Sequence, residues 1–138
     1  MGGVRKKILI LDHDERVLID LERILEDEGF ETTTTWDLRE ASDLLAQRDF
    51  DLLLLGEHPP EVRCAEFLKT LRSRQISPAY IVMGTAARHP FEGRYLCWLG
   101  AYAVMPKWKY SDIVAKIREH LSTTDVFGKI LTRRAAAG

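Results

Sequence analysis

The chain has 138 residues and a mass of 15.8 kDa, the size of one ordinary domain that can bury a core without metal ions or disulfide bonds. Its hydrophobic fraction of 46% and charged fraction of 30% exclude a disordered or fibrous chain. A formal net charge of -1 gives no overall field that would attract nucleic acid or anionic lipid, so neither is an expected partner.

The first elements alternate between strand and helix patterns. The apolar run at residues 8–11 predicts a buried strand, and it is too short for a signal peptide or a membrane span, so we expect a cytoplasmic protein. Residues 14–28 carry apolar side chains at the spacing of one helix face, and Gly29 is expected to end that helix. Residues 30–36 predict a short edge strand, and residues 37–48 predict a second helix.

The middle of the chain begins with the run LLLL at residues 52–55, which is apolar on both faces and therefore predicts a central strand covered by helices on each side. A helix is expected to follow and to end near Arg74. Residues 80–83 predict a fourth strand. Residues 92–99 are only weakly helical, because glycine and proline residues interrupt the region.

The last elements are a fifth strand at residues 101–105 and a helix capped by Ser111 that ends near Leu121. The composition changes after this helix, so residues 122–138 are expected to form a tail or linker. The order of elements predicts an α/β fold, a doubly wound five-stranded parallel sheet with helices on both faces.

Ligands of an open parallel sheet bind beyond the carboxyl ends of its strands, so the residues that follow each strand are the candidate site. They include carboxylates, a hydroxyl group and a lysine. These residues are Asp12, His13, Asp14, Glu15, Gly56, Glu57, His58, Gly84, Thr85, Ala86, Pro106, Lys107 and Trp108.

Three segments in this order resemble the receiver domain of two-component response regulators. KKILILDHDE resembles the first strand and acidic cluster of the family, FDLLLLGEHPP the third strand and its loop, and GAYAVMPKW the fifth strand and its lysine. The intervals from Gly100 and Thr85 to Lys107 are similar to those of the family's glycine, hydroxyl residue and lysine. The resemblance covers residues 5–121 and implies a flavodoxin-like three-layer sandwich that takes part in phosphorelay signalling.

The chain departs from the family at the phosphoacceptor position, which the register set by Asp51 and Pro60 assigns to Gly56. Glycine has no nucleophile. His13 replaces an acidic residue that holds Mg²⁺ in the family, and Mg²⁺ prefers oxygen ligands. Asp12 alone remains of the three metal carboxylates, so we expect no metal, no cofactor and no catalytic activity.

The remaining family residues are expected to be inherited structure. Thr85 and Lys107 could bind a phosphoryl group, but Gly56 provides none, and Lys107 is expected to form a salt bridge with Asp12. Val104 stands where the family carries an aromatic residue whose rotamer reports phosphorylation. These residues therefore predict a vestigial phosphoacceptor pocket in a degenerate receiver, a pseudo-receiver.

Two alternatives reuse this pocket. Glu57 could accept the phosphoryl group as in a conventional receiver, but neighbouring side chains on a strand point to opposite faces, so only a local bulge would allow it. Asp12, His13 and His58 could instead bind a transition metal for a metal-dependent activity. No compact ligand spacing supports that metal site, and histidines on polar loops are commonly solvated.

A candidate interface surrounds the fifth strand, where Tyr102, Val104, Trp108 and Tyr110 lie close together in sequence. Large aromatic side chains contribute strongly to interfaces when they are exposed. The expected function is a phosphorylation-independent signalling module of a two-component system. Its expected partner is a protein, namely a sensor kinase, an output protein or a second copy of the chain, and neither nucleic acid nor a membrane.

Overall fold

The computed structural model describes residues 5–57, 64–84 and 90–122. Five parallel strands form one sheet in the order β2-β1-β3-β4-β5, which places β3 in the middle and β2 at an edge, as the sequence predicts. The strands are β1 (Lys7–Leu11), β2 (Glu31–Thr35), β3 (Leu52–Gly56), β4 (Tyr80–Met83) and β5 (Ala103–Met105). The helices are α1 (Glu15–Asp27), α2 (Leu38–Gln47), α3 (Cys64–Ser73), α4 (Pro90–Trp98) and a last described helix at residues 110–122.

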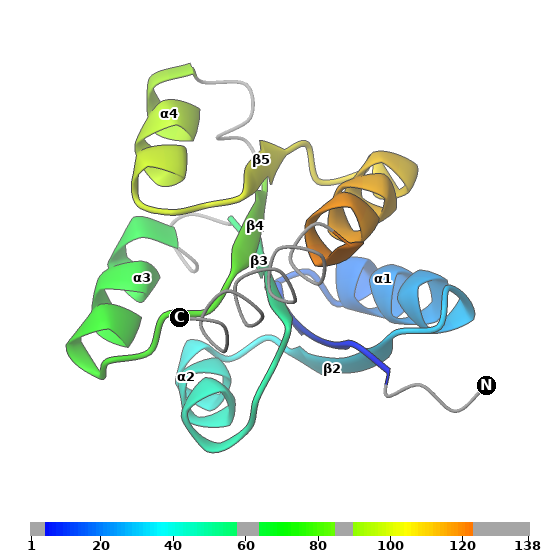
Figure 1. Ribbon diagram of the computed structural model, residues 1–138, viewed down its shortest axis with the longest axis horizontal. Helices are drawn as coiled ribbons and strands as arrows, with labels where there is room; N and C mark the ends of the chain where they lie inside the picture. The colour runs from blue at the N-terminus through cyan, green and yellow to red at the C-terminus, as the bar shows by residue number, and fades with distance from the viewer. Residues whose placement is uncertain (1–4, 58–63, 85–89, 123–138) are drawn as a thin grey trace, which may run out of the picture.

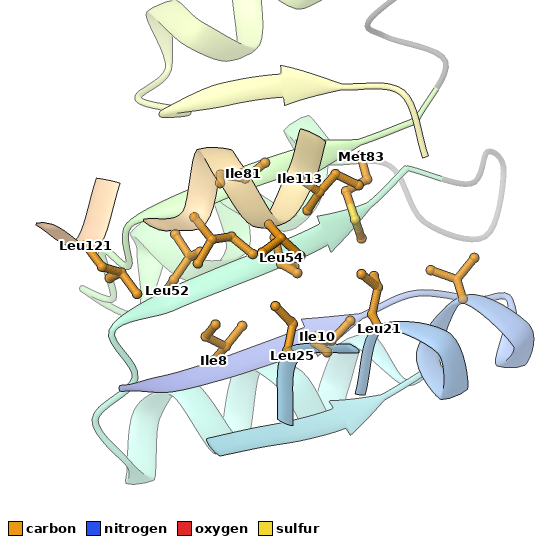
Figure 2. Packing of buried hydrophobic residues seen from close by; sticks show 13 residues of the cluster. Ile8, Ile10, Leu21, Leu25, Leu52, Leu54, Ile81, Met83, Ile113 and Leu121 are labelled. Atoms are coloured by element: carbon orange, nitrogen blue, oxygen red, sulfur yellow. The ribbon is translucent and has the colours of Figure 1, made fainter. Parts of the chain in front are cut away.

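The helices cover both faces of the sheet and make a three-layer sandwich (Figure 1). Alternate residues of each buried strand point to opposite faces, so Ile8 and Ile10 pack with α1 and the last helix, whereas Leu9 and Leu11 pack with α2, α3 and α4. Figure 2 shows the first of these two cores, in which side chains of β1, β3 and β4 meet α1 and the last helix. The structure therefore confirms the doubly wound α/β fold.

Local sequence signals explain where the first two helices begin and end. The Asp14 carboxylate accepts a hydrogen bond from the Arg16 backbone N–H at the start of α1, and Asp37 accepts from Arg39 at the start of α2. Gly29 ends α1 with a φ of 94°, a left-handed conformation that favours glycine. These local signals therefore fix the starts of α1 and α2 and the end of α1.

The C-terminal half differs from the sequence prediction at its element boundaries. Helix α4 begins at Pro90, because proline is well suited to the first turn of a helix. Strand β5 keeps only three of the five predicted residues, and the last helix starts at residue 110, so Ser111 lies inside it and does not cap it. Among the described residues, no helix is long and apolar enough to cross a membrane.

Candidate functional site

Asp12 and Lys107 meet at the carboxyl edge of the sheet. Asp12 directly follows β1, and Lys107 follows β5 after one intervening residue. The Lys107 Nζ lies 3.1 Å from Asp12 Oδ2 and 3.2 Å from Asp12 Oδ1. The Asp12 side chain is fully buried, and that of Lys107 is 11% exposed. This contact confirms the salt bridge predicted from the sequence.

Gly56, the last residue of β3, lies against the Asp12 carboxylate. A Cβ atom at position 56 would lie 2.0 Å from Asp12 Oδ2 and 2.6 Å from its Cγ, far closer than side-chain atoms approach each other. The carboxylate therefore occupies the space that any side chain at position 56 would need. We call Asp12, Gly56 and Lys107 together the β3 site.

Each oxygen of the buried carboxylate has a different environment. Asp12 Oδ1 accepts hydrogen bonds from the Asp14 backbone N–H at 2.8 Å and from Lys107 Nζ. Asp12 Oδ2 accepts no hydrogen bond of good geometry from the described residues, although Nζ lies 3.1 Å away. The ammonium group also donates to the carbonyl oxygen of Glu57 at 3.4 Å. Lys107 therefore supplies the positive charge next to both oxygens.

Glu57 directs its carboxylate toward helix α3. Its Oε2 accepts a hydrogen bond from the Cys64 backbone N–H at 3.1 Å, in the first turn of that helix, where a negative charge is favoured. Burial and the hydrogen bond to this carboxylate raise the pKa of the Cys64 thiol. The Glu57 side chain thus stabilises α3, and it is already engaged there.

The described residues do not fit the Mg²⁺ ion that receivers bind. Asp12 is the one carboxylate of the β3 site, and the Lys107 ammonium group already lies against it. His13 is exposed, and the described part of the chain has no group of three or more histidine, cysteine, aspartate or glutamate side chains placed to hold a metal. His58 and Thr85 lie outside the described residues, so the alternatives that use them stay predictions.

Exposed aromatic side chains flank the edge strand β5 in the chain, since Tyr95, Trp98 and Tyr102 precede it and Trp108 follows it. Trp98 of α4 is 79% exposed and stacks on Tyr95, with ring centroids 6.1 Å apart, and Trp108 beyond β5 is 58% exposed. Tyr102, which precedes β5, packs against His120 of the last helix. We call Tyr95, Trp98, Tyr102 and Trp108 the aromatic surface. Tyr95 is absent from the interface predicted above, although its spacing of three residues from Trp98 places both on one helix face.

Two other residues of the predicted interface are partly buried. Val104 packs against the core on the α2, α3 and α4 side of the sheet. Tyr110 donates a hydrogen bond from its hydroxyl group to Asp20 of α1 at 3.2 Å, and burial together with this carboxylate raises its pKa to about 12. These two residues connect the aromatic surface to the body of the domain, and their role in an interface stays a prediction.

Residues 8–118 of the sequence match the response regulator receiver domain family. The chain belongs to this family. It is 34% identical over 113 residues to the transcriptional regulatory protein CpxR of Escherichia coli K12. The aligned region covers 81% of this chain and 47% of CpxR. A second relative, the cell cycle transcriptional regulator CtrA of Caulobacter vibrioides, is 32% identical over 58% of this chain and 35% of its own length. The receiver therefore spans about half the length, or less, of these relatives.

Solved structures agree with this assignment. The receiver domain of Francisella response regulator 1452 superposes with a TM-score of 0.77 at 19% identity, over 87% of this chain and 99% of that one. A CheY-like receiver domain from Methanospirillum hungatei superposes with a TM-score of 0.76 at 25% identity, over 88% of this chain and 98% of that one. These similarities show the receiver fold.

Proposed function

We propose that this receiver is a degenerate one, which works as a phosphorylation-independent protein-interaction module of a two-component system. The observation that carries the proposal is the contact between Asp12 and Gly56. The acceptor position has no nucleophile, and the carboxylate of Asp12 fills the space where the acceptor side chain would stand. The lysine that would contact a phosphoryl group already has a negatively charged partner.

The two alternative functions, a conventional receiver with Glu57 as the acceptor and a metal-dependent activity, have less support. Glu57 uses its carboxylate at the start of α3, so acceptance of a phosphoryl group there would require that hydrogen bond to break. A metal-dependent activity would need ligands beyond Asp12, and the described residues offer no group that fits. Binding of a protein is therefore the proposed output.

Receiver domains of two-component systems interact with protein partners, and the aromatic surface supports the same role here. Exposed tryptophan and tyrosine side chains contribute more to association energy than other residues do. Strand β5 is also a short edge strand of three residues. A partner would therefore contact mainly the side chains around it, and less of its backbone. We propose a sensor kinase, an output protein or a second copy of the chain as the partner, in the cytoplasm.

Treatment with acetyl phosphate and Mg²⁺, followed by intact-mass measurement, tests the proposal. We expect the mass of the wild-type protein to stay unchanged. A gain of one phosphoryl group would overturn phosphorylation independence. Parallel treatment of Glu57→Gln identifies the acceptor in that case, because loss of the added mass in this variant would establish Glu57 as the conventional acceptor.

A further inference from the structure

The β3 site brings together two charged groups that water hardly reaches. Asp12 is fully buried and Lys107 is 11% exposed, so salt screens their attraction only weakly. The removal of one partner of such a pair leaves an uncompensated buried charge, which is strongly destabilising. The pair forms where it does because position 56 contributes no side-chain atoms.

We infer that Gly56 and Asp12 together form a built-in substitute for the side chain of an acceptor aspartate, with the glycine providing the space and Asp12 providing the carboxylate that holds Lys107. The inference rests on the proposed function, because it replaces the missing acceptor side chain of β3 with a carboxylate from the end of β1. Glycine at position 56 therefore does more than remove an acceptor side chain. It is also required for the Asp12 carboxylate to take its present position.

The anion also fixes the segment that leads to the aromatic surface. Lys107 is followed directly by Trp108, whose ring meets that of Tyr110 edge-on at a centroid distance of 6.3 Å. The Tyr110 hydroxyl group in turn bonds to Asp20 of α1. Contacts with Asp12 and Asp20 thus hold both ends of this short segment, and Trp108 is held between them in one arrangement.

A methyl group at position 56 tests the steric part of the inference. Gly56→Ala places its Cβ 2.0 Å from Asp12 Oδ2, so the carboxylate must move away from Lys107. We expect the melting temperature to fall by roughly 10 °C and the indole N–H signal of Trp108 to shift in the NMR spectrum. The control is Gly29→Ala, whose methyl group meets nothing within 4 Å but strains a φ of 94°. It should lower the melting temperature slightly and leave the Trp108 signal in place.

An exchange of the two residues tests the electrostatic part. The double variant Asp12→Gly with Gly56→Asp has the same composition as the wild type and offers Lys107 a carboxylate from β3. We expect it to melt at a higher temperature than either single variant and to return the Trp108 signal toward its wild-type position. The matched control is Asp12→Gly with Gly56→Asn, which has nearly the same shape without the charge and should recover neither.

Two results would overturn the inference: an unmoved Trp108 signal in Gly56→Ala, or equal recovery by the aspartate and asparagine double variants. If Gly56→Ala does not fold, Asp12→Asn still tests whether the buried charge holds this segment, since it removes the charge at nearly constant volume and should shift the Trp108 signal. Phosphorylation of the wild-type protein by acetyl phosphate would instead refute the proposed function. That outcome is independent of the exchange experiment, so the two failures can be told apart.

Discussion

The β3 site and the aromatic surface use their side chains in opposite ways. At the β3 site the polar groups are buried and contact one another, with Lys107 beside the Asp12 carboxylate. At the aromatic surface, large side chains such as Trp98 and Trp108 extend into solvent. The contrast supports the proposal that the polar site serves as internal structure in this receiver and that contacts with a partner are made near β5.

Removal of the buried carboxylate should lower the stability of the protein more than any of the other proposed changes. Asp12→Ala leaves the Lys107 ammonium group without its partner, so we expect a loss of about 3 to 5 kcal/mol in the free energy of unfolding, measured with urea. The control is Asp43→Ala, which breaks a solvent-exposed ion pair with Arg74 at 3.1 Å and should cost less than about 1 kcal/mol. Equal losses in the two variants would show that the β3 site is not electrostatically special.

Truncation of a side chain at the aromatic surface should have a smaller effect. We expect it to change association and to leave stability nearly unchanged. Trp108→Ala is expected to weaken self-association or partner binding by about 1 to 3 kcal/mol, measured by sedimentation, with little change in melting temperature. Trp36→Ala is the control, because Trp36 is 69% exposed but follows β2 at the opposite edge of the sheet. Unchanged association in Trp108→Ala together with a sharp fall in its melting temperature would mean that Trp108 supports the fold.

The smallest expected effect is a loss of stability at alkaline pH. It comes from the buried thiol of Cys64, whose backbone N–H contacts Glu57 next to the β3 site. Burial raises the pKa of Cys64 above its ordinary value of 9.0, so the unfolded state ionises first and stability is lost as pH rises past that value. We expect about 1 kcal/mol of unfolding free energy to be lost between pH ~9 and pH ~10.

Cys64→Ala should lack this loss, whereas Cys97→Ser, at an exposed cysteine, should retain it. Above pH ~10 the tyrosines add further losses, since burial raises the pKa of Tyr80 to about 12. An identical pH dependence in wild type and Cys64→Ala would contradict the assignment of this effect to Cys64.

Much of the fold follows from the sequence, because the apolar runs and the periodic helix faces leave few arrangements open. The tetraleucine run predicts a strand buried on both faces, and β3 is such a strand at the centre of the sheet. The expected cap at Ser111 is wrong, because the hydrogen bond from the Ile113 N–H to the Lys109 carbonyl starts the last helix at residue 110. Local signals place such boundaries only to within a residue or two.

The candidate site was only half predictable. The contact between Asp12 and Lys107 follows from their places after β1 and β5 and from their opposite charges. The approach of the Asp12 carboxylate to Gly56 does not, because it depends on the rotamer of one side chain and on the separation of two strands. Sequence alone therefore predicts that a nucleophile is missing at position 56, but it does not predict which group fills the space.

An NMR spectrum recorded with and without beryllofluoride and Mg²⁺ tests most directly whether the aromatic surface is independent of the phosphorylation chemistry. Beryllofluoride mimics a phosphoryl group on an acceptor aspartate, which the β3 site lacks. We expect the indole N–H signal of Trp108 to stay at the same position under both conditions. A shift of that signal on addition of beryllofluoride and Mg²⁺, absent with Mg²⁺ alone, would contradict it.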